Sequence, residues 1–255
     1  MGLRSFSANA LLVVSFYIIS FSTISHAHDS EMSKKVDYFN ELVFGSEFGG
    51  DNGKVVKWVK DINIFIEGDV PQHLSYELDS IIKEINKLVK NIRLQRVDSL
   101  SDANYLLFLG RGADYAKVEL NLTSKVKNNF AAFWVYRNSD YEITQGSMYV
   151  DTYRVKNELE QKHLLREELT QSLGIMNDSY KYPESIFYQK WTQTISFTNF
   201  DKFVIRALYS DKIKPGMTKN IANIYLASAK LLSEGYTKSR VCSKPPYAIN
   251  ACSMM

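Results

Sequence analysis

The sequence predicts an α+β domain in which long helices pack on one mixed sheet. Its strand-like segments come in runs that helices interrupt, without the regular βα alternation of a doubly wound fold. One helix, over residues 72–92, has strong 3.6-residue periodicity. Three segments rich in aromatic and β-branched residues, 104–110, 131–137 and 146–152, are typical of neighbouring strands. We therefore expect one folded domain over residues 28–240, with a helical C-terminal part.

The remaining elements follow from local patterns. A short helix is expected around residues 36–43, followed by a Gly/Asp/Asn-rich turn, and a strand over residues 61–69 that ends before a proline. The long helix after it has its apolar stripe at Leu74, Leu78, Ile81, Ile82, Ile85, Leu88, Val89 and Ile92. A helix over 155–174 should end at Gly174, and two more helices are expected over 200–210 and 217–236.

Residues 1–27 have the pattern of a secretory signal peptide. Arg4 gives a positive start, residues 10–24 are uncharged and mostly apolar, and the small residues Ser25 and Ala27 mark a cleavage site. An uncleaved anchor is the alternative, but the apolar run is shorter than the roughly 20 residues that a spanning helix needs. We expect cleavage after Ala27, export to the periplasm or the medium, and no stable membrane span in the mature chain.

The charge balance argues against nucleic acid as a partner. The chain of 255 residues has 31 basic and 28 acidic side chains, a formal net charge of +3, and no lysine or arginine block. A polypeptide or a cell-envelope component is the expected ligand.

The two cysteines, Cys242 and Cys252, both lie near the C-terminus. In an exported protein such a pair most simply forms a disulfide, which would pin the tail of residues 241–255. Two free thiols are the alternative. No neighbouring cysteine or histidine gives a zinc-ribbon spacing.

One stretch, "HLLREELTQSLGIMNDS" over residues 163–179, carries the candidate site. A zincin helix binds zinc through two histidines at i and i+4, and the glutamate after the first histidine activates the metal-bound water. Here Glu167 and Gln171 stand at the two ligand positions, Glu168 at the position of the general base and Gly174 at the turn. Both zinc histidines are therefore replaced.

The sequence downstream is similar to metzincin-type peptidases in the same order. Asn177, with Asp178 beside it, stands where those enzymes place a third ligand. Residues 182–188, "YPESIFY", resemble the turn beneath the metal, formed here by Ser185, Ile186 and Phe187, with phenylalanine in place of methionine. Residues 200–210 resemble the closing helix.

A narrower resemblance covers roughly residues 38–220. The segments "ELVFGSEFG", "ANYLLFLG", "REELTQSLGIMNDS" and "LYSDKIKPGM" resemble the bacterial domain-of-unknown-function family numbered 2927, a set of exported, zincin-like proteins. That family typically lacks the zinc histidines. The resemblance implies a zincin-like α+β domain with a degenerate metal site and says little about catalysis.

No cofactor is expected, and zinc or another divalent cation is the alternative. Oxygen ligands from Glu167, Gln171, Asn177 and Asp178 would suit calcium, magnesium or manganese better than zinc. His163 lies one turn before Glu167 and is expected to be a partly exposed histidine near the helix start. His28 and His73 have no ligand spacing.

Several interpretations of the site remain open. The polar residues of the helix face solvent if only Leu164, Leu165, Leu169 and Leu173 pack inward. A metal-free hydrolase would divide acid and base roles between Glu168 and Asp178. The leading hypothesis is a binding protein with a degenerate metal site; an unconventional peptidase or cell-wall hydrolase using Glu168 as general base is the rival, and a purely structural envelope protein is a third class.

Overall fold

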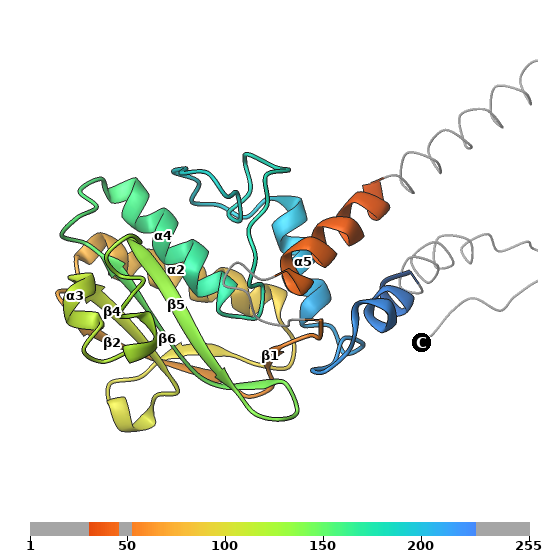
Figure 1. Ribbon diagram of the computed structural model, residues 1–255, viewed down its shortest axis with the longest axis horizontal. Helices are drawn as coiled ribbons and strands as arrows, with labels where there is room; N and C mark the ends of the chain where they lie inside the picture. Colours follow the sequence, from red (N-terminus) through yellow and green to blue (C-terminus); the bar gives the residue numbers. More distant parts are fainter. Residues whose placement is uncertain (1–30, 46–52, 228–255) are drawn as a thin grey trace, which may run out of the picture.

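The fold is α+β, as the sequence predicts. A computed structural model describes residues 31–45 and 53–227, which form one sheet with helices packed against it (Figure 1). The expected signal peptide (1–27), His28, Cys242, Cys252 and the tail of residues 241–255 lie outside the described residues.

The sheet has six strands and is mixed. All pairs are parallel except the pair of β5 and β6, which is antiparallel. From one side the order is β3, β2, β4 and β6, while β5 lies on the other side of β6 and β1 pairs with the first residues of β6. The strands are β1 (Lys57–Trp58), β2 (Ile62–Gly68), β3 (Leu94–Arg96), β4 (Tyr105–Gly110), β5 (Ala131–Arg137) and β6 (Glu142–Asp151).

The three strands expected to be neighbours, now β4, β5 and β6, do pair with one another through β6. Strands β1 and β3 were not expected, because two or three residues are too few to show an alternating pattern. A one-turn helix, α3 (Gly112–Tyr115), was also missed. The expected order of long elements is thus confirmed within the described residues, and the short pairing segments are additions; residues 228–236 of the helix expected over 217–236 lie outside them.

Helix α2 (Gln72–Leu88) buries the predicted apolar stripe but ends earlier than expected. Val89 already has extended dihedrals, so the helix does not reach residue 92. The cause is the following strand: the Asn86 side chain accepts from Leu94 N and donates to Leu94 O, at 2.9 and 2.8 Å. These two bonds fix the start of β3 against the helix and require the chain to turn first.

Helix α4 (Glu158–Gln171) lies against α2 and across the sheet (Figure 1). It begins at an Asn157 cap, three residues later than the expected start. Arg166 is almost completely buried and pairs with two α2 carboxylates, Glu77 at 2.6 Å and Glu84 at 3.2 Å. These ion pairs, together with the apolar core between the helices, hold α4 in a fixed position on the sheet.

The helical C-terminal part is confirmed over the residues described. Helix α5 (Asn199–Leu208) begins at a capping box formed by Thr198 and Asp201, and residues 219–227 are helical. The N-terminal helical segment, residues 31–44, lies beside α5, where Tyr38 meets Phe200 edge to face at 6.0 Å. No helix among residues 31–45 and 53–227 is long and apolar enough to cross a membrane.

The sheet has a different core on each face, and β5 contributes to both. Ala131 and Phe133 belong to the main cluster with the leucines of α2 and α4. Ala132 belongs to a smaller cluster on the other face, with Phe108, Tyr115, Leu122, Val126 and Tyr149. Alternate β5 side chains therefore point toward α4 and away from it.

Candidate functional site

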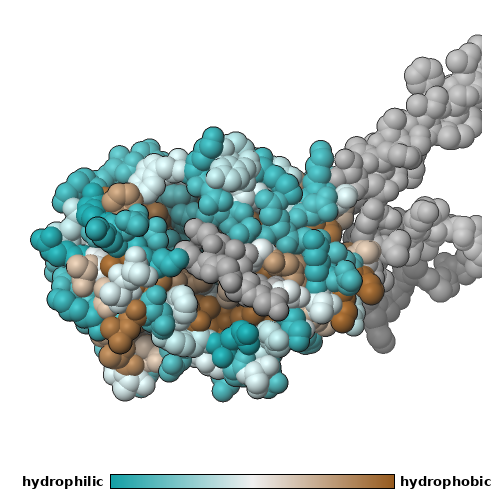
Figure 2. Space-filling model, viewed as in Figure 1, coloured by the Kyte–Doolittle hydropathy of each residue, from teal (hydrophilic) through white to brown (hydrophobic). Residues whose placement is uncertain are grey.

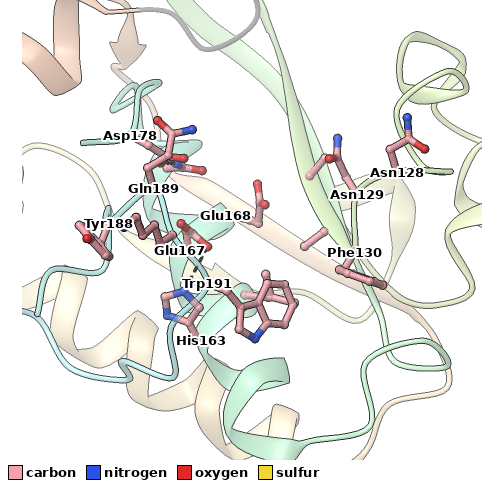
Figure 3. Close-up of a pocket in the computed structure, with 15 residues that line it drawn as sticks. Asn128, Asn129, Phe130, His163, Glu167, Glu168, Asp178, Tyr188, Gln189 and Trp191 are labelled. Carbon is pink, nitrogen blue, oxygen red and sulfur yellow. Dashed lines mark hydrogen bonds and ion pairs between the residues drawn. The ribbon is translucent and has the colours of Figure 1, made fainter. Parts of the chain in front are cut away.

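A pocket of about 310 Å³ lies between α4 and the beginning of β5 (Figure 3). One wall is formed by α4 and by the segment from Tyr188 to Trp191. The other wall is formed by residues 128–132, which lead into β5 and include its first two residues. The face of the molecule seen in Figure 2 is largely hydrophilic, with apolar patches between.

The predicted α4 stripe lines this pocket. His163, Glu167, Glu168 and Gln171 all contribute to the wall, and Asp178 joins them from the following segment. The glutamate and glutamine side chains are not turned to open solvent, since the Glu167 side chain is only 13% exposed and Gln171 only 3%. The interpretation of a plain solvent-facing helix is therefore wrong, although the four leucines are buried as it assumed.

His163 is buried, contrary to the expectation of a partly exposed residue. Its Nδ1 lies 2.7 Å from the carbonyl oxygen of Thr194. A carbonyl oxygen can only accept, so Nδ1 must carry a hydrogen, and Nε2 is left facing Glu167 Oε2 at 3.4 Å. Burial lowers the pKa of His163, although the bond to Thr194 and the charge of Glu160 act in the opposite direction. His163 thus joins α4 to the segment after Trp191.

Gln171 and Asp178 are brought together, and Asn177 is not part of their contact. Gln171 Nε2 donates to Asp178 Oδ1 at 2.6 Å. The Asn177 side chain is directed to the N-terminal helical segment, where its Nδ2 donates to Glu41 O at 3.2 Å, and it does not line the pocket. The loop after Gly174 therefore brings Asp178 to the pocket. Asn177, which stands at the third ligand position in the sequence, does not line it.

Glu168 projects into the pocket from α4, opposite residues 128–130 (Figure 3). Glu168 also acts on two tyrosines of the sheet side. Burial raises the pKa values of Tyr105 and Tyr115, and the negative charge of Glu168 adds a smaller upward contribution. The carboxylate is thus placed at the wall of the pocket and above the sheet.

The predicted turn of Ser185, Ile186 and Phe187 is completely buried. Ser185 Oγ donates to Asp201 Oδ1 at 2.6 Å and accepts from Phe187 N at 2.9 Å, and Tyr38 Oη lies 2.7 Å away. Burial raises the pKa of Asp201, against the lowering effect of these and other hydrogen bonds. The turn is tied to the segment that carries Asp178. Ser179 N donates to Phe187 O, and Ser179 forms an isolated β-bridge with Tyr188.

The end of α4 is fixed by close packing. Trp58 Nε1 donates to Ser172 O at 3.0 Å, and Tyr209 Oη donates to Leu173 O at 2.8 Å. Gly174 has a φ of 110°, and a Cβ there would lie 2.0 Å from Val56 O. Only glycine can take this position, so the chain leaves the helix at a set point and carries Asp178 back over Gln171.

Aromatic side chains join the two walls at one end of the pocket (Figure 3). Phe130 and Trp191 meet edge to face, with ring centroids 5.5 Å apart, and both are partly exposed. Phe130 is also covered by the Arg154 guanidinium, 5.0 Å from its ring centroid. The sequence did not indicate these two aromatic residues as part of the site, because Phe130 precedes a strand and Trp191 lies in an irregular segment with no motif.

The residues present do not fit a zinc centre. Gln171 directs its amide nitrogen at Asp178, and His163 Nδ1 is engaged by a backbone carbonyl. Among residues 31–45 and 53–227, no group of three or more His, Cys, Asp or Glu side chains is arranged to hold a metal ion. A cation bound through oxygens of Glu167 and Asp178 stays a prediction.

Residues 33–228 match the family described as "Protein of unknown function (DUF2927)", and the chain belongs to this family. No curated protein matches the chain. Two solved structures are similar to it: "Structure of Myroilysin", at 14% identity and a TM-score of 0.41, and "Crystal structure of myroilysin", at 13% and 0.39. Each covers 66% of this chain, and the matched parts are 89% and 94% of those chains.

Proposed function

We propose that this protein binds an extended polypeptide, which adds as a strand to the open edge of β5 and places side chains in the pocket. The observation that carries the proposal is the position of β5. Among the residues that the structure describes, β5 pairs only with β6, and its first residues form one wall of the pocket. An edge strand offers a row of backbone donors and acceptors to a ligand of extended conformation.

The hydrogen-bonding register identifies which β5 residues face the ligand. Asp151 N donates to Phe130 O at 2.7 Å, so the backbone of Phe130 points toward β6. Directions alternate along an antiparallel strand, and the register is regular from Ala131 to Tyr136. The N–H and C=O groups of Ala131 and Phe133 therefore point to the outer edge, where a ligand strand would meet them.

The two walls suit a polypeptide. Planar amides of Asn128, Asn129 and Gln189 line the pocket and can both donate and accept hydrogen bonds. The Phe130–Trp191 pair supplies apolar contact area at one end. Backbone pairing would give affinity, and the pocket would select among side chains.

Binding without zinc-dependent cleavage is favoured by the residues at the ligand positions. Glu167 and Gln171 replace the two histidines that hold a catalytic zinc, and with them goes the Lewis acid that lowers the pKa of a bound water to about 7. We propose that the protein is exported, so that it would meet polypeptides of the periplasm, the medium or the cell envelope. A hydrolase that uses Glu168 as general base is the second candidate, because that carboxylate does project into the pocket.

The test is a backbone scan of a bound peptide. The purified chain is first screened against a library of eight-residue peptides, and each residue of the strongest binder is then N-methylated in turn. We expect affinity to be lost at every second residue and kept at the residues between, because only alternate N–H groups of an added strand face β5. Loss at no position, or at positions without a period of two, contradicts strand addition.

The matched protein variant is Ala131→Pro. It removes one outward N–H of β5 and leaves the pairing with β6 intact, so the fold should persist by circular dichroism. We expect affinity to fall by roughly fivefold for the loss of one hydrogen bond. Ala132→Pro is the contrasting control, because Ala132 faces β6 and its substitution should disturb the sheet itself.

A further inference from the structure

We infer that the ligand strand carries an aromatic or branched apolar side chain opposite Trp134, on the face of the sheet that points away from α4. The inference rests on the proposed function and adds the sequence preference of the ligand. This side chain would lie on the opposite side of the ligand strand from the side chains that enter the pocket.

The direction of the Trp134 side chain follows from its neighbour across the sheet. Trp134 packs against the smaller core cluster and pairs with Ser147 of β6. Ser147 Oγ lies 2.7 Å from Oη of Tyr115, a member of that cluster, which covers the face away from α4. Residues directly opposite each other on neighbouring strands point their side chains to the same face. A ligand residue opposite Trp134 therefore points away from α4 as well.

Trp134 has apolar surface left for a ligand to cover, since it is only partly buried. Ser147 lies beside it on β6, whereas in the described part of the chain no strand pairs with the other edge of β5. Tyr136 follows two residues later on the same face and is 42% exposed. We call these two side chains, Trp134 and Tyr136, the aromatic ledge.

The Tyr136 ring is held in place through its hydroxyl group. Tyr136 Oη donates to Glu119 Oε1 at 3.0 Å and accepts from Asn121 Nδ2 at 2.8 Å. A side chain that is already fixed loses little conformational entropy when a ligand covers it. The aromatic ledge is therefore prepared for contact before the ligand arrives.

Trp134 lies near the middle of the part of β5 that a ligand strand can follow. The register with β6 is regular from Ala131 to Tyr136, and it shifts between Tyr136 and Arg137. A ligand strand that follows this regular stretch must place one residue opposite Trp134, whether it runs parallel or antiparallel to β5. Contact with the aromatic ledge is thus a consequence of strand addition itself.

The two faces of the ligand strand meet different chemistry. On the α4 face, the amides of Asn128, Asn129 and Gln189 line the pocket. On the other face, the ledge offers ring surface, and covering it stabilises the complex in proportion to the apolar area removed from water. Pairs of aromatic residues, or of an aromatic and a β-branched residue, across neighbouring strands add to this stabilisation. Serine at the same ligand position would cover little of the ring surface.

The experiment is a double-mutant cycle between ligand and protein. Each residue of the strongest eight-residue binder is replaced in turn by phenylalanine and by serine, and affinity is measured by fluorescence polarisation of fluorescein-labelled peptides. At one position phenylalanine should bind about threefold to fivefold more tightly than serine. With Trp134→Thr, which keeps a residue suited to strands, this ratio should fall below about twofold.

Two further variants separate the ledge from the rest of the site. Trp134→Tyr keeps an aromatic ring and should retain most of the preference. Trp191→Thr removes a tryptophan from the pocket wall and should leave the ratio of phenylalanine to serine unchanged, even if affinity falls for both peptides. Circular dichroism checks that each variant is folded.

A cross-linking measurement on the unmodified protein needs no variant. A photoreactive benzoylphenylalanine at the preferred ligand position should attach to residues 132–136 or 119–121, as mapped by mass spectrometry. Attachment to α4, or a ratio that no ligand position shares with Trp134, overturns the inference; if N-methylation then keeps its period of two, the proposed function stands. If the period of two is absent as well, both are wrong.

Discussion

Nε2 of His163 lies 3.4 Å from Oε2 of Glu167, while the other ring nitrogen contacts the carbonyl of Thr194. One buried imidazole thus lies between a pocket carboxylate and the segment that carries Trp191. The position of the aromatic end of the pocket depends on a residue one helical turn away from the predicted site.

Two substitutions of His163 should separate its contacts. Asparagine can place its Nδ2 where Nδ1 stands and keep the bond to Thr194, whereas glutamine reaches toward Glu167 and loses that bond. We expect His163→Gln to destabilise the fold by about 1–3 kcal/mol and to speed amide hydrogen exchange in residues 188–195. His163→Asn should keep slow exchange there. Equal exchange in both variants would show that the Thr194 bond does not hold the segment.

Glu168 provides the test of zinc chemistry. The mature protein should retain less than one equivalent of zinc after dialysis, measured by elemental analysis, and should show no chelator-sensitive proteolysis. Glu168→Gln should alter ligand binding more than any turnover, because Glu167 and Gln171 stand where a zincin has the two histidines that hold its zinc. Cleavage that a chelator stops, zinc restores and Glu168→Gln abolishes would identify a zinc enzyme with carboxylate and amide ligands.

Lys57 predicts a pH dependence of stability at alkaline pH. Its Nζ donates to Leu208 O and Ile213 O, both at 2.7 Å, and burial lowers its pKa to about 8. Between this pKa and the ordinary lysine value of 10.5, which applies in the unfolded chain, the unfolded chain binds more protons than the folded one. The contribution of Lys57 to stability therefore rises with pH across this window.

The comparison is made with Lys57→Met by urea unfolding at pH 7.5 and 9.5. We expect the wild type to gain about 2 kcal/mol relative to the variant between these pH values. Parallel curves for the two proteins would mean that the folded pKa of Lys57 is close to its ordinary value.

Ser185 holds the buried turn beneath the site. Ser185→Ala removes the partner of Asp201, Tyr38 and the Phe187 amide at once, and all three are buried. We expect a loss of about 3 kcal/mol in the free energy of unfolding, since buried polar groups left unpaired are costly. Ser80→Ala, which removes only an exposed contact to Glu84, is the control and should change stability by less than about 0.5 kcal/mol.

The termini give a prediction that mass spectrometry can test. Intact exported protein should lack residues 1–27, and its mass should be lower by two hydrogens because of a Cys242–Cys252 disulfide. In the chain-entropy model so short a loop contributes on the order of 2–3 kcal/mol. Alkylation of both cysteines without prior reduction would contradict the bridge.

The sequence was sufficient for the long elements and for one wall of the site. The apolar stripe of α2 and the spacing of Glu167, Glu168 and Gln171 follow the helical period. Such spacing can be recognised in the sequence, because it places side chains on one face of a helix. The other wall depends on which residues meet across the sheet, and no local pattern encodes the contact of Phe130 with Trp191. The burial of His163 likewise depends on a segment about thirty residues away, through the Thr194 carbonyl.

In the part of the chain that the structure describes, the outer edge of β5 has no pairing strand, and this bears on how the protein behaves in concentrated solution. Its sequence, AAFWVYR, has no proline and only one charged residue, which stands at its end. An unprotected edge of this kind can pair with the same strand of a second molecule and begin aggregation. A peptide occupying the edge would block that contact, so saturating ligand should raise the concentration at which the protein stays monodisperse.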